Sequence, residues 1–108
     1  MSYSISSIPV FDKQAKRLAK KYPSLKNDLA ELIKKPGNNP EQGTHLGNSF
    51  YKIRLAITSK GKGKSGGARV ITYVKVVATI VYLSSIYDKG EKDTITDKEL
   101  QDIFKEIP

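Results

Sequence analysis

The sequence predicts a single α+β domain over residues 1–108, in which two helices precede an antiparallel meander and a third helix follows it. Three observations lead to this prediction: helical spacing of apolar residues at 12–35, strand-like runs between residues 50 and 87, and a capping motif near the C-terminus. A short strand-like run at the start completes the order β-α-α-β-β-β-α. Grouped helices beside consecutive strands are typical of an antiparallel sheet, and the length suits one hydrophobic core.

The N-terminal third predicts a short strand and a two-helix hairpin. Residues 3–8 alternate in part and stop at Pro9, which fits a strand at a sheet edge. Residues 12–22 form an apolar stripe on an otherwise basic helix. This stripe consists of Ala15, Leu18, Ala19 and Tyr22. After Pro23 a second helix carries an apolar side and reaches a typical helix end. Its apolar side is Leu25, Leu29, Leu32 and Ile33, and its end is Lys34, Lys35, Pro36 and Gly37.

Residues 36–48 are rich in Gly, Pro and Asn and are predicted to form a connecting loop. The loop holds His45, the only histidine of the chain. Because the sequence has no cysteine and no second histidine, His45 lacks the usual partners of a metal site. We therefore assign it no role, and we expect neither a metal nor a cofactor.

The centre of the chain contains two strand-like runs, 50–58 and 68–73. Period-2 alternation divides the first run into a packing face and a basic face. The packing face holds Tyr51, Ile53, Leu55 and Ile57, and the other face holds Lys52, Arg54 and Ala56. Between the runs, residues 60–67 (the Lys/Gly loop) place lysines on a backbone whose glycines allow positive φ. Such a loop either faces phosphates or is simply solvated.

A further strand is predicted at 79–87, joined to the run at 68–76 by a tight turn at 76–78. The polar segment 87–93 (the exit segment) leaves this strand. Thr96 and Glu99 then form a T-x-x-E capping box, and apolar residues at helical spacing continue to the end of the sequence. These residues are Leu100, Ile103, Phe104 and Ile107.

The net charge of +8 is unevenly distributed. Residues 1–75 hold fifteen Lys or Arg against four Asp or Glu, whereas residues 76–108 hold four against seven. A basic body suggests a polyanionic partner, although a lysine-rich solvated surface has the same composition. The absence of cysteine excludes disulfides and favours the cytoplasm. No segment predicts an export signal or a membrane span.

Several catalytic motifs are incomplete. Gly63-Lys64-Ser65 resembles the end of a Walker A loop, but Thr58 stands where that motif requires glycine, and a strand follows where a helix is needed. The carboxylates of the exit segment are Asp88, Glu91 and Asp93, which we interpret as a solvated charged loop. A Ser/His/Asp arrangement would have to use His45, and no nucleophile motif accompanies it.

Four segments closely resemble the RelE/ParE superfamily of type II toxin-antitoxin toxins. They are IPVFDKQAKRLAKKYPSL at 8–25, YKIR at 51–54, GKGKSGGARVI at 61–71 and VYLSSIYDKGEKD at 81–93. The resemblance implies the RelE/ParE toxin-like fold, with a sheet, a two-helix hairpin and a concave basic face. It also implies a cognate antitoxin, and a C-terminal helix that moves or is covered when this antitoxin binds.

In the RelE branch, the resemblance implies metal-free, ribosome-dependent cleavage of mRNA, in which the RNA 2′-hydroxyl attacks the adjacent phosphate. By motif position, the family's cations fall on Lys52, Arg54, Arg69 and Lys89. We expect Lys52 to act as the base and the two arginines to stabilise the phosphate charge. Ile95 stands where the best-known branch has a tyrosine. Tyr87 is the nearest aromatic hydroxyl and could instead stack on a base, so the general acid stays open.

We expect the chain to contact RNA or the ribosome through five lysines. They are Lys60, Lys62 and Lys64 of the Lys/Gly loop, and Lys16 and Lys20 of the first helix. The expected partners are an antitoxin and mRNA on the ribosome. A ParE-like, non-enzymatic inhibitor of DNA gyrase and a basic RNA-binding module without catalysis are the alternatives. The set of four cations favours the enzyme, because a protein inhibitor has no need of converging phosphate binders.

Overall fold

A computed structural model describes residues 3–34 and 39–108 and contains a five-stranded sheet with the order β1-β5-β4-β3-β2. The strands are β1 (Ser4–Ser7), β2 (Thr44–Gly47), β3 (Phe50–Leu55), β4 (Ala68–Lys75) and β5 (Ile80–Asp88). The helices are α1 (Pro9–Lys21), α2 (Leu25–Ile33) and α3 (Asp97–Phe104), with short 3-10 turns η1 (Thr58–Lys60) and η2 (Val76–Ala78). The predicted α+β class is confirmed. None of the helices in the described ranges is long and apolar enough to cross a membrane.

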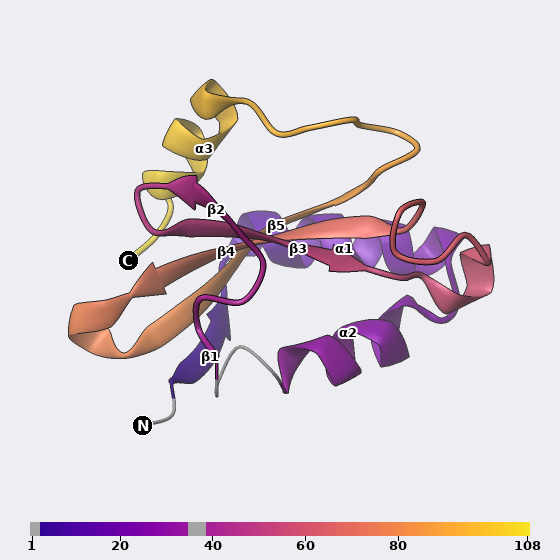
Figure 1. The fold of residues 1–108 in the computed structure, drawn as a ribbon, viewed down its shortest axis with the longest axis horizontal. Coiled ribbons are helices and arrows are strands. Elements are labelled where there is room, and N and C mark those ends of the chain that lie inside the picture. The colour runs from indigo at the N-terminus through magenta and orange to yellow at the C-terminus, as the bar shows by residue number, and fades with distance from the viewer. Residues whose placement is uncertain (1–2, 35–38) are drawn as a thin grey trace.

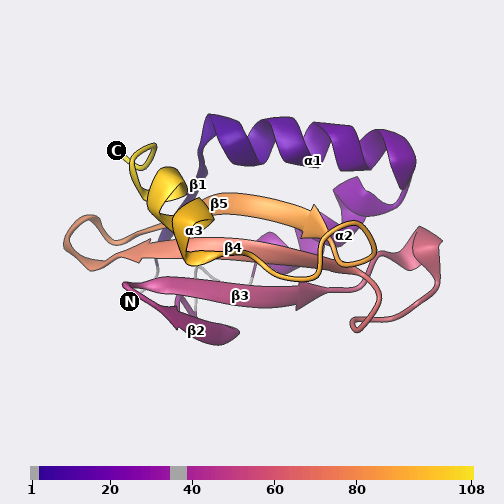
Figure 2. The ribbon, with the colours of Figure 1, turned by 90° about the horizontal axis from the view of Figure 1, so that it is seen from above.

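The sheet separates α3 from α2. Figure 1 shows α3 above the central strands and α2 below them, and Figure 2 shows α1 alongside β5. The Gln14 side chain of α1 accepts a hydrogen bond from the Ile86 N–H at 3.0 Å, and so covers the part of β5 that extends beyond β1. The hairpin buries Leu18, Leu25 and Leu32 in the core, as its apolar stripes predicted, and it also buries Phe11. The expected helix end at residues 35–37 lies outside the described residues.

The first strand lies at a sheet edge, as expected, but β1 pairs with β5 in parallel. The sheet is therefore mixed, with antiparallel pairing from β5 through β2. Because β1 and β5 lie at opposite ends of the chain, no tight turn fixes their relative direction. The long connection allows the parallel arrangement, which the short N-terminal run could not reveal.

A second correction concerns the predicted loop at 36–48, of which residues 44–47 form strand β2. This strand pairs with β3, and its register shifts between His45 and Gly47. Gly47, Asn48 and Ser49 all have positive φ, which reverses the chain within a few residues. The segment THLG lacks alternating apolar residues, so only its pairing with β3 makes it a strand.

The predicted alternation of the first central run is confirmed at Ile53, Leu55 and Ile57, which are buried on the hairpin side. The strand itself ends at Leu55, because the chain turns into η1 at Thr58. The opposite face is basic at Arg54 but aromatic at Phe50. Phe50 is buried there and packs edge-on against Tyr73, with ring centroids 5.0 Å apart. The aromatic end is where α3 lies.

Candidate active site

Sheet register brings the predicted catalytic residues together on the face that carries α3. Arg54 of β3 lies directly opposite Arg69 of β4, and Arg69 lies opposite Tyr87 of β5. Directly opposed residues share a face and have Cβ atoms about 5 Å apart. By period 2, Lys52 lies on this face next to Arg54, and Lys89 follows Tyr87. These residues come from three strands and the exit segment and form one cluster, here called the cation row. Its members are Lys52, Arg54, Arg69, Tyr87 and Lys89.

The Arg69 side chain is 6% exposed and is covered by the Lys/Gly loop. Its Nη1 donates hydrogen bonds to the carbonyl oxygens of Lys64 at 2.9 Å and Ala68 at 3.1 Å. Its Nη2 donates to the carbonyl oxygen of Ser65 at 3.3 Å. The end of the loop lies directly against the end of β3 because Gly67 has no side chain: a Cβ there would meet the Leu55 carbonyl oxygen at 2.0 Å. The guanidinium is therefore occupied by backbone acceptors of its own chain.

Tyr87 is also 6% exposed, and its hydroxyl has no hydrogen-bond partner among the described residues. Burial raises the pKa of this hydroxyl, and the positive charge of Arg69 opposes the shift only in part. The Lys92 ammonium lies 5.6 Å from the centroid of the Tyr87 ring. Tyr87 is thus a neutral hydroxyl at neutral pH, with its proton uncommitted.

The carboxylate of Asp93 lies within the cation row. Lys89 Nζ donates to Asp93 Oδ1 at 2.6 Å and to the Asp93 backbone carbonyl at 2.8 Å. The bond from Lys89 lowers the pKa of Asp93, and the charge of Lys52 lowers it further. The prediction of a solvated carboxylate is correct for Asp93, whose side chain is 90% exposed, but wrong for Asp88, which is 1% exposed at the end of β5.

Lys60 belongs to a different cluster from the one expected. Its Nζ lies 2.6 Å from Oδ1 of Asp88, a carboxylate that is 1% exposed. The Tyr22 hydroxyl donates to Oδ2 at 2.6 Å, and the Gly90 N–H donates to Oδ1 at 2.9 Å. Burial alone would raise the pKa of Asp88, but these hydrogen bonds outweigh burial and lower the pKa to about 2. The pair fastens the start of the Lys/Gly loop to the end of β5.

The other lysines expected to contact RNA are exposed. Lys62 and Lys64 lie on the outer part of the Lys/Gly loop, and Lys16 and Lys20 lie on the outer side of α1. Two further cations of α1 are paired with the exit segment. They are Arg17, 3.0 Å from Glu91, and Lys21, 3.4 Å from the same carboxylate. The exposed lysines are thus separate from the cations that hold the fold together.

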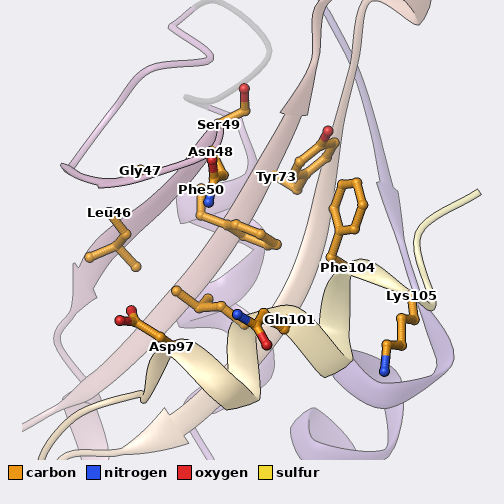
Figure 3. Close-up of a pocket in the computed structure, with 11 residues that line it drawn as sticks. Leu46, Gly47, Asn48, Ser49, Phe50, Tyr73, Asp97, Gln101, Phe104 and Lys105 are labelled. Carbon is orange, nitrogen blue, oxygen red and sulfur yellow. The ribbon is translucent and has the colours of Figure 1, made fainter.

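A groove of about 890 Å³ opens between α3 and the turn that joins β2 to β3. Figure 3 shows Phe50, Tyr73 and Phe104 lining one part of it. The Phe104 side chain is 52% exposed, and its ring lies 5.6 Å from that of Tyr73. This groove is apolar on the sheet side and adjoins the aromatic end of the face that also carries the cation row.

A family model described as the RelE toxin of the RelE/RelB toxin-antitoxin system matches residues 10–107. The chain belongs to the RelE toxin family. Its members are toxins of toxin-antitoxin systems, as the resemblance of the four sequence segments suggested.

Three solved structures share the fold of this RelE-family toxin. A double mutant of E. coli toxin RelE in the free state gives a TM-score of 0.63 at 16% identity, covering 98% of this chain and 94% of that one. The isolated E. coli RelE toxin gives 0.51 at 17% identity, covering 98% and 100%. The intact E. coli RelBE toxin-antitoxin complex gives 0.50 at 19% identity, covering 81% and 96%. At these identities the likeness establishes the fold.

In this RelE-family toxin, the described residues contain no group of three His, Cys, Asp or Glu side chains that could hold a metal ion. The side chains gathered in the cation row are instead proton donors, proton acceptors and fixed positive charges. Such groups can stabilise a phosphate whose charge increases during reaction, and they can move protons to and from its oxygens.

Proposed function

We propose that this toxin is a ribosome-dependent endoribonuclease that cleaves mRNA without a metal ion and thereby inhibits translation. The observation that carries the proposal is the cation row, in which Arg54, Arg69 and Tyr87 occupy one register row across three strands. The other two members of the cation row, Lys52 and Lys89, lie beside these three residues. Family membership supports the same activity.

In the proposed reaction, Lys52 in its neutral form accepts the proton of an RNA 2′-hydroxyl as the 2′-oxygen attacks the neighbouring phosphorus. The bond from phosphorus to the 5′-oxygen breaks, leaving a 2′,3′-cyclic phosphate on one fragment. The departing 5′-oxygen takes a proton from Tyr87 or Lys89. Arg54 and Arg69 stabilise the negative charge that builds on the phosphate oxygens.

Lys52 and Arg54 are the members best placed to meet RNA directly. Neither makes a side-chain hydrogen bond or an ion pair with the residues of the described ranges. Arg69 and Lys89 already bind acceptors of their own chain, so RNA must replace those acceptors. Tyr87 is a candidate for the general acid because its hydroxyl is protonated at neutral pH and donates to no acceptor among the described residues.

We assign ribosome contact to the exposed lysines Lys16, Lys20, Lys62 and Lys64. Lys60 was expected among them, but its short pair with Asp88 favours a structural role. The proposed partners are mRNA on the ribosome and a cognate antitoxin, as the RelBE complex suggests for the fold. The groove beside α3 offers the antitoxin an apolar surface. Action on ribosomes places the protein in the cytoplasm.

Single-turnover cleavage of mRNA on programmed ribosomes tests the proposal. We expect Lys52→Ala to lose about 100-fold or more in rate, as for a missing general base. We expect a loss on the order of 100-fold from Arg54→Ala, because one preorganised donor is missing. Lys34→Ala is the matched control, since it removes an exposed cation that pairs with Glu31 on α2.

Three results would contradict the proposal. Equal cleavage of ribosome-bound and naked RNA would remove the dependence on the ribosome. Intact mRNA together with inhibition of gyrase supercoiling would replace the enzyme with the gyrase inhibitor. Normal cleavage by folded Lys52→Ala and Arg54→Ala proteins would leave the cation row without a catalytic role.

A further inference from the structure

The Lys/Gly loop covers Arg69, one of the two arginines of the proposed reaction. Arg69 is buried beneath the loop, and its guanidinium donates to the carbonyl oxygens of Lys64 and Ser65. Carbonyl oxygens are neutral acceptors, whereas an RNA phosphate is an anionic acceptor with the geometry to take two guanidinium hydrogens. The closed loop therefore satisfies Arg69 with weaker partners than the proposed substrate would offer.

The closed arrangement also leaves like charges together. Arg54 and Arg69 are directly opposed across β3 and β4, which is unfavourable for two cations. Arg54 and Lys64 also line a small polar pocket whose lining includes the acidic residues Asp28 and Glu31 of α2. An anion that binds both Arg54 and Arg69 relieves the repulsion between these two opposed cations, and the neutral loop carbonyls do so only in part.

The loop can open without unfolding its base. At the base, the Asp28 carboxylate accepts a hydrogen bond from the Thr58 hydroxyl at 2.7 Å, and Lys60 is fixed by Asp88. The outer part of the loop, residues 62–66, is held by Arg69 and by one backbone hydrogen bond of 3.3 Å from the Gly66 N–H to the Lys62 carbonyl. Gly61 and Gly63 both have positive φ, and nothing lies within 4 Å of a Cβ built on either. The outer segment is thus anchored lightly between a fixed base and β4.

We propose that the Lys/Gly loop is a lid closed on Arg69, and that an RNA phosphate opens it by taking the guanidinium from the carbonyls of Lys64 and Ser65. In the free protein, the Arg69 guanidinium is therefore hydrogen-bonded to the loop and does not bind a phosphate. Opening adds Arg69 to Lys52 and Arg54, which completes the phosphate site. The proposal rests on the proposed function, because it takes RNA as the anion that binds Arg69.

Wild-type protein gives the first test, with a short oligodeoxynucleotide as the probe. Such a probe carries the phosphates of a nucleic acid but has no 2′-hydroxyl, so it is not cleaved. Hydrogen exchange of the Gly66 amide reports the lid, and exchange of the Lys60 amide reports the base. We expect saturating probe to speed Gly66 exchange by at least about tenfold, since the charge-assisted bonds of Arg69 to the loop are lost. Lys60 exchange should not change.

A loop variant gives the second test. Gly63→Ala strains the closed conformation at φ +62 without a steric clash, and should favour the open lid by about tenfold. Because binding then no longer has to open the lid, affinity for the oligodeoxynucleotide should rise by a similar factor. Gly47→Ala is the matched control: it has φ +95 and open space around its Cβ, but lies at the end of β2. The control should change neither Gly66 exchange nor affinity.

The outcomes separate the lid from the proposed function. If bound probe leaves Gly66 exchange unchanged or slower while the Arg69 guanidinium NMR signals shift, the loop stays closed and the lid is wrong, although the phosphate site stands. If Gly63→Ala speeds exchange but weakens binding, the loop is a fixed support and the lid is also wrong. If the probe shifts no signal of Lys52, Arg54 or Arg69, a phosphate does not open the loop and the lid is wrong, whereas the proposed function is decided separately by cleavage on programmed ribosomes.

Discussion

At the scale of single residues, Asp88 determines how the start of the Lys/Gly loop meets the sheet. Its buried carboxylate accepts hydrogen bonds from Lys60, from the Tyr22 hydroxyl and from the Gly90 N–H. These donors come from η1, from the end of α1 and from the exit segment. A buried charge is tolerated only when it is paired and hydrogen-bonded in this way. Asp88 therefore links three separate parts of the chain at one point.

This arrangement predicts a loss of stability in acid. The pKa of Asp88 is about 2 in the folded protein, whereas an unfolded aspartate has a pKa of about 3.9. A depressed carboxyl pKa stabilises the fold at pH values above the unfolded pKa, and this contribution disappears as the pH falls through the folded pKa. We expect roughly 2 kcal/mol of unfolding free energy to be lost between about pH 4 and pH 2 for this reason. Urea denaturation across that range measures it.

The variant Asp88→Asn tests whether this carboxylate is the cause. At pH 7 it should lower the free energy of unfolding by roughly 2 kcal/mol or more, because Lys60 also loses its counter-charge. The gap between variant and wild type should close as the pH approaches 2. Asp93→Asn is the matched control, since its carboxylate also pairs with a lysine but is 90% exposed, and it should change stability little. An equal effect of the two variants would contradict the role of burial.

At the scale of elements, the outer part of the Lys/Gly loop should contribute electrostatic affinity for ribosomal RNA. Lys62 and Lys64 are exposed there, and each phosphate contact adds about 0.7 to 0.9 to the slope of log K against log salt. We expect the double variant Lys62→Ala/Lys64→Ala to lower that slope by about 1.4 to 1.8. Ribosome binding measured over a series of salt concentrations gives the slope.

The control for this experiment is Lys26→Ala/Lys34→Ala, which removes the same charge from α2. If both double variants lower the slope equally, the lysines act only through net charge. If neither changes it, the Lys/Gly loop is a solvated connection. Lys60→Ala should behave differently from both, reducing stability through Asp88 and leaving the slope nearly unchanged.

The elements also show what local sequence can predict. The two hairpin helices, the central strands and the capping box of Thr96 follow from spacing within one segment, and all are present. Strand β2 and the parallel pairing of β1 depend on a partner strand far along the chain or on a shifted register. Local spacing contains neither, so both were missed.

The candidate site could likewise be predicted from the sequence only in part. Period 2 placed Lys52 and Arg54 on one face, and resemblance to the family added Arg69 and Lys89. Tyr87 was included as the nearest aromatic hydroxyl. Sheet register brings these residues together. The acceptors that hold them could not be predicted. Which carboxylate meets Lys60, and which carbonyls meet Arg69, depends on the folding of two loops whose residues are polar throughout.

At the scale of the whole molecule, the acidic residues of the exit segment neutralise selected cations of the basic body. Asp88 pairs with Lys60, Glu91 with Arg17 and Lys21, and Asp93 with Lys89. The acidic C-terminal part is therefore folded against the body, where it compensates cations near the end of α1 and beside the cation row. The exposed lysines of α1 and of the Lys/Gly loop keep a positive field, which is the sign that the proposed RNA partner requires.

This charge distribution leads to a prediction for cells. A protein that reaches RNA through the ribosome, and whose cations are partly compensated, should cut mRNA only where ribosomes are engaged. Producing the toxin in a bacterial host without its antitoxin should stop translation and arrest growth, with cuts confined to coding regions. Blocking initiation beforehand, so that ribosomes leave the mRNA, should abolish the cuts.

Lys52→Ala/Arg54→Ala at the same protein level should allow growth, because the proposed base and one phosphate ligand are missing. Mapping of RNA 5′ ends together with a translation assay provides the measurement. Cuts that persist without initiating ribosomes, or arrest by the double variant at the wild-type level, would show that the toxicity does not come from the cation row acting on the ribosome.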